Sequence, residues 1–374
     1  MRRPVRAWGA AAVTALLAPL LTAVPAQARE TERAAGTCRP ALRILGTLPG
    51  TAGSDADRVE GLGPGSTAVG TSRGLPVYWT GTRVHRVPLP AGYTGGEVEA
   101  VNSGGLMVGS LRKPGGSAAF SYRAGARSVT LLPGGSRATD VNDHGLIVGE
   151  GPKAGALTGV EWTGTRVLRR LTLPAGYTLT EVTGINEAGR IVGSGEAVAG
   201  DESWTAGLLW PARGNAPAVP LKPYWPAGVP YDFWSPEDID NSGRIVGTHD
   251  YSRLDIQSPV HWLPPYGSEI RPGLLAGRTS GTFEAVSPTT NVSVGTAQDS
   301  SFDGPFPPES APPVQAQIWP GSGPLLALPR LAPDGASEAY AVSDDGRAGG
   351  RAADAHGTSR PVIWTCALAQ AYQP

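Results

Sequence analysis

The chain has 374 residues, with 31 Lys plus Arg against 32 Asp plus Glu and a formal net charge of -1. Its 52 Gly and 36 Pro follow no strict triplet period, which excludes a collagen or a coiled coil, while 40% hydrophobic residues are enough to build a core. Because the charge is balanced, no basic surface is available to attract nucleic acid or anionic lipid. The composition predicts a folded protein rich in turns, without a nucleic-acid partner.

The start of the chain has the pattern of a secretory signal peptide. A positively charged segment precedes an apolar stretch at residues 7–24, and residues 26–28 (Ala-Gln-Ala) form a small-x-small cleavage site. Pro19 interrupts the apolar stretch, which is short for a membrane anchor. We expect residues 1–28 to be removed and residues 29–374 to be exported as a single domain, soluble outside a bacterial cell and not attached to a membrane.

A two-part repeat recurs along the rest of the chain. The first part is an apolar residue, a turn of the form Asn-x-x-Gly and an apolar segment that ends in Gly. Its clearest copies occupy residues 101–109, 141–149, 185–193 and 239–247, and degenerate copies end at Gly70, Gly295 and Gly350. The second part is an aromatic residue that closes an apolar segment: Trp79, Tyr122, Trp162, Trp210, Trp262, Trp319 and Trp364. The chain therefore contains seven repeat units.

Each unit predicts four short antiparallel strands, which we number from first to fourth. The first strand carries the apolar residue before the turn, where Asn tolerates and Gly readily adopts a left-handed conformation. The second is the Ile-Val-Gly segment, the third ends at the aromatic residue, and a tight turn such as Thr80-Gly81-Thr82 leads to the fourth. Seven such units of about 49 residues predict an all-β, seven-bladed β-propeller, with a flat array or a parallel β-helix as alternatives.

The two ends of the chain complement each other. Too few residues follow Trp364 to form a fourth strand, whereas residues 38–50 resemble a fourth strand that has no unit of its own. We expect this N-terminal segment to complete the last blade and close the ring. Cys38 and Cys366 would then meet, and a disulfide between them is expected in an exported chain. Two unrelated free thiols are the alternative.

The connections between second and third strands vary in length, and variable loops on a rigid scaffold are common binding sites. The longest connections belong to units four to six, and the segment 223–235 concentrates aromatic residues. Rigid aromatic rings can stack on sugars or anchor a protein partner, although they can also pack as a lid over neighbouring blades. The candidate ligand-binding residues are Trp204, Tyr224, Trp225, Tyr231, Asp232, Phe233, Trp234, His249 and Tyr251.

Glutamates recur two positions before the apolar residue of the first strand. They are Glu60, Glu99, Glu237 and Glu284. At the start of inner strands, such carboxylates would lie near the mouth of a central channel and could attract a cation or a basic group. A solvated strand end is the alternative interpretation.

Signals for catalysis and metal binding are weak. The segments 140–145 and 238–243 begin like calcium loops, but neither supplies the later oxygen ligands, and the five His are dispersed. We therefore assign no catalytic residue, no metal ligand and no cofactor. An enzyme using paired carboxylates remains an alternative, with candidates Asp201, Glu202, Asp232, Asp250 and Asp255.

The repeat resembles the extracellular HAF-type repeats of bacterial secreted proteins, which are named for a His-Ala-Phe run before the Trp. Residues 117–122 (Ser-Ala-Ala-Phe-Ser-Tyr) are the nearest match, and the resemblance covers about residues 57–364. It implies an exported, repeat-built, propeller-like protein, and it transfers no activity to any residue.

We therefore expect a secreted, monomeric β-propeller that acts as a binding module. The expected ligand is a carbohydrate or cell-envelope polymer, or a protein, bound on the long-loop face of units four to six. The alternatives are a polysaccharide-active hydrolase or lyase on the same face and a purely structural or interaction protein.

Overall fold

Short antiparallel β-strands make up nearly all regular structure in the chain. The structure is a computed structural model, and it describes residues 38–50, 57–153, 156–199, 202–222, 232–251, 256–300 and 312–374. The expected all-β class is confirmed. Residues 39–374 form one compact unit, whereas the predicted signal peptide at residues 1–28 lies outside the described residues.

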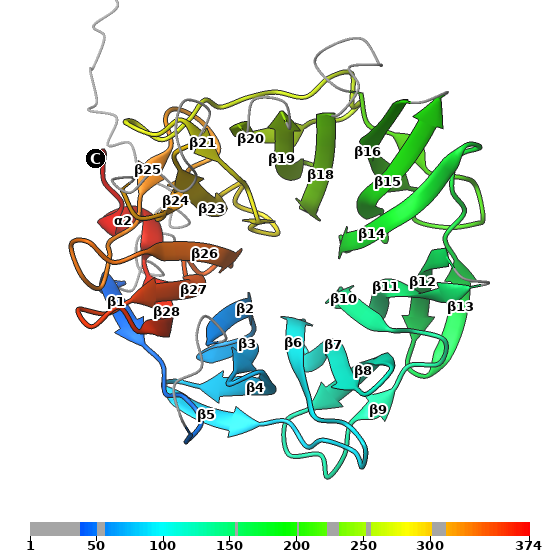
Figure 1. The fold of residues 1–374 in the computed structure, drawn as a ribbon, viewed down its shortest axis with the longest axis horizontal. Helices are drawn as coiled ribbons and strands as arrows, with labels where there is room; N and C mark the ends of the chain where they lie inside the picture. Colours follow the sequence, from blue (N-terminus) through cyan, green and yellow to red (C-terminus); the bar gives the residue numbers. More distant parts are fainter. Residues whose placement is uncertain are drawn as a thin grey trace, which may run out of the picture. The chain divides into compact units, whose positions relative to one another are not determined.

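The first three repeats each form a separate four-stranded antiparallel sheet, in which strands pair in chain order. The sheets are β2 (Arg58–Leu62), β3 (Thr67–Ser72), β4 (Leu75–Thr80) and β5 (Arg83–Arg86); β6 (Gly95–Val101), β7 (Leu106–Lys113), β8 (Gly116–Arg123) and β9 (Thr130–Leu131); and β10 (Arg137–Val141), β11 (Leu146–Lys153), β12 (Ala156–Thr163) and β13 (Arg166–Arg170). In Figure 1 the first strand of each sheet lies nearest the centre and the last lies outermost.

The next two repeats share one seven-stranded sheet. It contains β14 (Tyr177–Ile185), β15 (Ile191–Ala199), β16 (Glu202–Trp210), β17 (Val219–Pro220), β18 (Asp232–Ile239), β19 (Ile245–Tyr251) and β20 (Ile256–Trp262). A single parallel pair, Thr205 with Phe233, joins its two halves. The second half departs from the four-strand expectation, because its outer strand is reduced to a bridge between His261 and Ile270. Residues 264 and 265 of this connection are prolines, which lack the N–H groups that a longer strand needs.

The last two repeats form two further sheets, and the final one includes a strand from the N-terminal end of the chain. One is built from β21 (Ser280–Gly281), β22 (Ala285–Val286), β23 (Ser293–Gln298), β24 (Gln315–Trp319) and β25 (Leu326–Ala327), and the other from β26 (Ser337–Val342), β27 (Ala348–Ala353), β28 (Ser359–Thr365) and β1 (Ala41–Ile44). β1 runs antiparallel to β28, with Ile44 opposite Val362 (Figure 1). The N-terminal segment thus supplies the outer strand of the last sheet.

A disulfide bond also joins the two ends of the chain, next to the pair of strands β1 and β28. The predicted disulfide is present, because Cys38 and Cys366, the two cysteines of the sequence, are both disulfide-bonded. The short helix α2 (Ala367–Gln370) follows, and Tyr372 then pairs with Ala327 of β25. Within the described ranges, no helix is long and apolar enough to cross a membrane.

The aromatic residue of each repeat is buried. Five of the repeat tryptophans have no exposed surface, namely Trp79, Trp162, Trp210, Trp262 and Trp364. Each also donates its indole N–H to a main-chain carbonyl that follows the outer strand of a neighbouring repeat, as Trp162 does to Pro133 at 3.0 Å and Trp364 to Pro329 at 2.8 Å. A buried indole N–H needs such a partner. The repeat tryptophan therefore both fills the core and links neighbouring repeats.

The asparagine of the Asn-x-x-Gly turn has a different role from the one expected. Gly105, at the end of the turn, has a positive φ of 73°, whereas Asn102 is absent from the described residues with positive φ. The Asn102 side chain accepts the N–H of Leu106 and donates its amide to the carbonyl of Asn142 at 2.9 Å. Asn142 and Asn186 repeat the pattern toward the next turn. These asparagines hold successive inner turns together.

Candidate functional site in the central cavity

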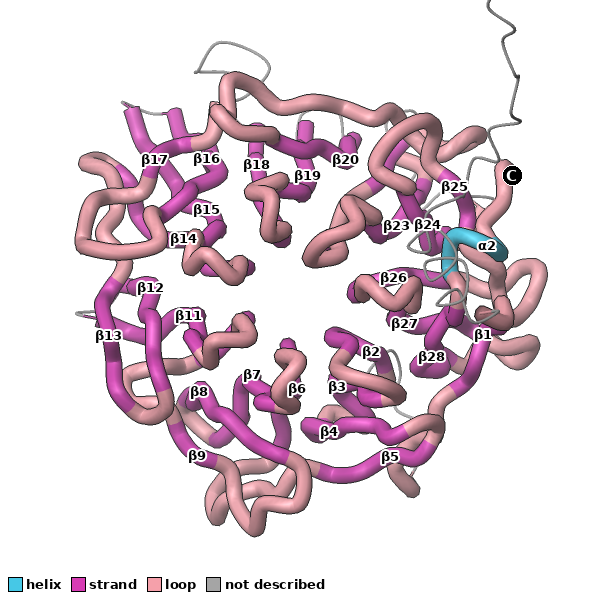
Figure 2. The backbone as a smooth tube through the Cα atoms, turned by 180° about the vertical axis from the view of Figure 1, so that it is seen from behind, coloured by secondary structure: helices cyan, strands magenta, loops and turns pink. Residues whose placement is uncertain are grey.

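Two adjoining cavities lie among the innermost strands. The turn-side cavity, about 510 Å³ in volume, is lined mainly by the turns that connect the first two strands of each repeat, and Figure 2 shows these turns around the centre. The ring cavity, about 230 Å³, lies among the innermost strands themselves. Both cavities are lined by Glu60, Glu99, Asp140, Asp238 and Tyr340, so together they form one central cavity.

A β-bulge brings one side chain of an innermost strand to the ring cavity. In β6, Val98 pairs with Gly109 and Ala100 pairs with Val108, so Glu99 is an extra residue in the strand. The same register shift occurs in β2, β10, β14, β18 and β26, and Glu284 precedes β22 at the corresponding position. The resulting set, which we call the ring residues, lines the cavity: Glu60, Glu99, Thr139, Thr183, Glu237, Glu284 and Tyr340.

The repeated glycine explains why the bulge fits. A Cβ added to Gly109 would lie 2.1 Å from the carbonyl oxygen of Glu97, and one added to Gly350 would lie 2.0 Å from that of Glu338. These distances are far below a van der Waals contact, so any larger residue would push the bulge away. The glycine that sequence analysis used as a strand end is therefore what allows the innermost strand to present a ring residue.

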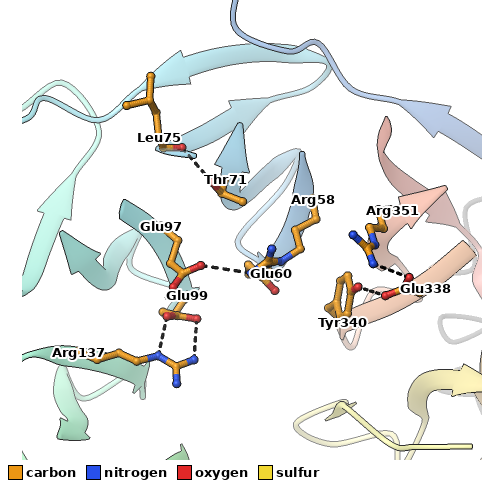
Figure 3. A network of polar contacts seen from close by, with 10 residues as sticks. All are labelled: Arg58, Glu60, Thr71, Leu75, Glu97, Glu99, Arg137, Glu338, Tyr340 and Arg351. Carbon is orange, nitrogen blue, oxygen red and sulfur yellow. Dashed lines mark hydrogen bonds and ion pairs between the residues drawn. The ribbon is translucent and has the colours of Figure 1, made fainter. Parts of the chain in front are cut away.

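Arginines neutralise the glutamates on one side of the ring cavity (Figure 3). Arg137 donates from Nε and Nη2 to the two carboxylate oxygens of Glu99, at 2.7 and 3.2 Å. Arg58 pairs with Glu60 and also donates to Glu97 at 3.2 Å. The sequence expectation included the glutamates but missed both arginines, which lie at the beginning of innermost strands.

A further ion pair lies beside the ring residue Tyr340. Its hydroxyl donates to Glu338, and Arg351 pairs with the same carboxylate at 2.6 Å (Figure 3). Burial is the main cause that raises the pKa of Tyr340, followed by the charge of Glu338. Tyr340, Thr139 and Thr183 were also missed, although they stand at the same offset from the apolar residue as the four glutamates.

The other side of the ring cavity holds carboxylates without such neutralisation. Among the described residues, Glu181, Glu237 and Glu284 form no ion pair with Lys or Arg. Glu284 accepts the hydroxyl of Thr282 at 2.8 Å and Glu181 accepts that of Ser194 at 3.3 Å. No hydrogen bond to the Glu237 carboxylate occurs within the described ranges.

Burial shifts the titration of Glu237, Glu284 and Glu99. Desolvation raises the pKa of Glu237 well above its usual range, and the neighbouring charges of Glu284 and Glu181 add to the shift. Desolvation likewise raises the pKa of Glu284, and it raises that of Glu99 to about 7 although Arg137 opposes the change. The cavity thus concentrates acidic groups that resist ionisation unless a positive charge is close.

Asp140 and Asp238 connect neighbouring innermost strands. Asp140 accepts the N–H of Ile185 at 2.8 Å, and Asp238 accepts that of Val286 at 2.9 Å. Burial is the main cause that raises their pKa, to about 7 for Asp140 and about 6 for Asp238. Asp140 and Asp238, which begin the two incomplete calcium-loop segments, thus have a structural role in linking strands. In the part of the chain that the structure describes, no three His, Cys, Asp or Glu residues are grouped to hold a metal ion.

Among the residues that the structure describes, the aromatic candidates do not form an exposed shelf. Trp234 and Asp232 are each 5% exposed and His249 is fully buried, so these three side chains do not present the exposed surface that stacking on a ligand requires. Of the remaining candidates, Phe233 is 36% exposed, Trp204 and Tyr251 are half-buried, and Tyr224, Trp225 and Tyr231 lie outside the described residues. The physical reason is that the indole of Trp234 and the imidazole of His249, which lie opposite each other on paired strands, bury more apolar surface by packing inward.

His249 is the centre of a buried polar cluster. Its ring stacks on Tyr251 and lies 4.4 Å from that of Trp234, while its nitrogens lie 3.0 Å from Glu269 Oε1 and 3.3 Å from Asp232 Oδ2. Glu269 also accepts the indole N–H of Trp234 at 2.6 Å. Burial opposes ionisation of Glu269, yet its hydrogen bonds to His249 and Arg271 hold its pKa below the usual range. The cluster is a satisfied structural network that sequence spacing gave no means of finding.

Comparison with known proteins bears on the fold. No family model and no curated protein matches the sequence. The β-propeller domain of the Trilobed protease from Pyrococcus furiosus, described as having an open velcro topology, is similar with a TM-score of 0.55 at 11% identity, covering 83% of this chain and 95% of that chain. YCF48 from Cyanidioschyzon merolae gives a TM-score of 0.50 at 11% identity, covering 87% and 98%. At these identities the similarity concerns the fold alone, and this chain therefore has a β-propeller fold.

Proposed function

We propose that the protein is an exported, closed, seven-bladed β-propeller whose acidic central cavity binds the positively charged groups of a ligand. Closure is supported by the pairing of β1 with β28. It is also supported by Trp79, which donates to the carbonyl of Gly46 at 2.7 Å just after β1, as other repeat tryptophans do toward the preceding sheet. β1 therefore takes the place that an outer strand has elsewhere in the molecule.

Export is supported by the disulfide and by the pattern of residues 1–28. A disulfide persists in oxidising compartments and is rare in the cytosol. The resemblance to HAF-type repeats of secreted proteins points the same way. The protein would then meet its ligand at the cell surface or beyond it.

The observation that carries the binding proposal is the set of unneutralised carboxylates on one side of the ring cavity. Carboxylates inside a cavity with low-dielectric walls attract a cation more strongly than the same groups on an open surface. The carbohydrate polymer or protein expected from the sequence would thus be recognised here through its positively charged groups, and not through aromatic stacking on the long-loop face.

Calorimetric titration of the mature chain with a lysine oligomer tests this function. We expect binding that weakens as salt rises, no binding of a glutamate oligomer, and weaker binding by Glu99→Gln. Glu196→Gln is the matched control, because Glu196 is exposed on β15 and does not line either cavity. Failure of the wild-type chain to bind any cationic oligomer contradicts the proposal.

A further inference from the structure

The central cavity carries its charge unevenly around the ring. Arg58 and Arg137 stand beside the glutamates of β2 and β6, whereas β14 and β18 and the residue before β22 contribute Glu181, Glu237 and Glu284 without an arginine. A cation entering the cavity therefore meets carboxylates already paired with arginines on one side and carboxylates without such a partner on the other. The cation would therefore bind on the side of the cavity with Glu181, Glu237 and Glu284.

Glu237 is the least satisfied of these groups. Its carboxylate has no hydrogen-bond or ion-pair partner among the described residues, and protein encloses it except where it lines the ring cavity. Removing a charged group from water without a partner is costly, so such groups are normally paired. Glu284, the ring residue of the next repeat, is close enough to act on the charge of Glu237, and the opposing effect of Arg137 is smaller than that of Glu284 or Glu181. Glu237 and Glu284 together therefore form a site for one positively charged group.

The turn-side cavity, through which a ligand would reach Glu237 and Glu284, is lined by acidic residues and by apolar surface. Asp143, Glu187 and Asp344 line the turn-side cavity. Each is held by a main-chain N–H of a neighbouring turn; for example, Asp143 accepts from Ser103 at 2.7 Å and Asp344 from Thr289 at 2.9 Å. The apolar repeat residues line the same cavity, including Leu62, Val101, Val141, Ile185, Ile239 and Val286.

We infer that the central cavity takes an alkylammonium or guanidinium group carried on an extended chain, with Glu237 and Glu284 as the residues that determine specificity. The inference rests on the proposed function of the same cavity and names its ligand class. The donors of such a group point in several directions, so they can bond carboxylates that come from separate strands. The methylene stem would lie along the apolar lining of the turn-side cavity while the charge reaches the ring.

The same chemistry can come from a free polyamine or from a basic side chain of a protein. Titration of the mature chain with spermidine and with a lysine hexapeptide separates these sources, and an acetylated hexapeptide controls for the charge. We expect Glu237→Gln and Glu284→Gln each to weaken binding of the preferred ligand at least tenfold, whereas Glu196→Gln binds like the wild type. Far-ultraviolet circular dichroism verifies that each variant is folded.

Each outcome decides between the two proposals. Unchanged affinity in folded Glu237→Gln and Glu284→Gln, together with persistent cation binding, overturns the inference but leaves the proposed function standing. Displacement of the amine by Ca²⁺ or Mg²⁺ at lower concentration also overturns it, since the site would then be a metal site. The absence of any cation binding by the wild-type chain removes the proposed function as well.

Discussion

Individual buried polar side chains join neighbouring strands of this molecule through hydrogen bonds and ion pairs. The cluster around His249 joins β18 and β19 to the connection after β20, through Asp232 on one side of the imidazole and Glu269 on the other. Arg271 adds a positive charge beside Glu269. Removal of one member of a buried charged set is costly, because its partners keep their charges without solvent.

Replacing His249 should therefore destabilise the fold strongly. We expect His249→Ala to lose about 3–5 kcal/mol of unfolding free energy, because Asp232 and Glu269 would face each other across an empty space. Urea denaturation followed by tryptophan fluorescence measures the loss. His144→Ala is the control, since its side chain is 71% exposed and its removal should change the stability by less than about 0.5 kcal/mol. A similar small effect at His249 would contradict this account of the cluster.

At the scale of elements, the strand pair that begins each repeat combines a bulge with a glycine. The prediction is that Gly109→Ala destabilises the protein by about 1–3 kcal/mol, because the new Cβ would collide with the Glu97 carbonyl. The variant should also bind the lysine oligomer more weakly, since Glu99 sits on the displaced bulge. Thermal unfolding and calorimetry measure the two effects.

Gly267→Ala is the matched glycine control. No atom lies within 4 Å of a Cβ at this position, and its φ is not positive, so the substitution should be close to neutral. Equal stability of the two variants would show that the bulge tolerates a side chain.

The sequence predicted the strands better than their interactions. Alternation of apolar residues with Gly and Trp located the inner strands, and the short tail after Trp364 correctly pointed to pairing with an N-terminal strand. The lateral role of Asn102 was missed because it depends on the next repeat, which lies far along the chain. The ring glutamates were noticed, but their neutralisation by Arg58 and Arg137 depends on bulges that no spacing rule reveals. Tertiary packing also buried Trp234, which composition alone favoured as a ligand contact.

At the scale of the whole molecule, the buried carboxyls make stability depend on pH. The pKa of Glu99 and of Asp140 is raised to about 7 and that of Asp238 to about 6, so each binds its proton more tightly in the folded chain. This contribution is complete below about pH 4 and is lost as the pH rises through 6 to 7. Glu269, whose pKa is lowered, acts in the opposite direction as a single group.

We therefore expect the free energy of unfolding to be lower at pH 8 than at pH 5. Urea denaturation across this range measures it, and Asp140→Asn should flatten the dependence because it removes one titrating group. Greater stability at pH 8 in the wild-type chain would contradict the direction of these pKa shifts.

The attachment of β1 decides whether the molecule behaves as one closed unit. Replacing both cysteines with serine should cost about 2–5 kcal/mol of stability by releasing a constraint on the unfolded chain.

β1 has four residues, and its described strand partner is β28, so its amides should exchange with solvent first. The outer strand β13, at the edge of its own continuous hairpin, should keep its protection and serves as the internal control. Simultaneous loss of protection in β1 and β13 would mean that the sheets open together, and that the proposed ring does not depend on its N-terminal strand for local closure.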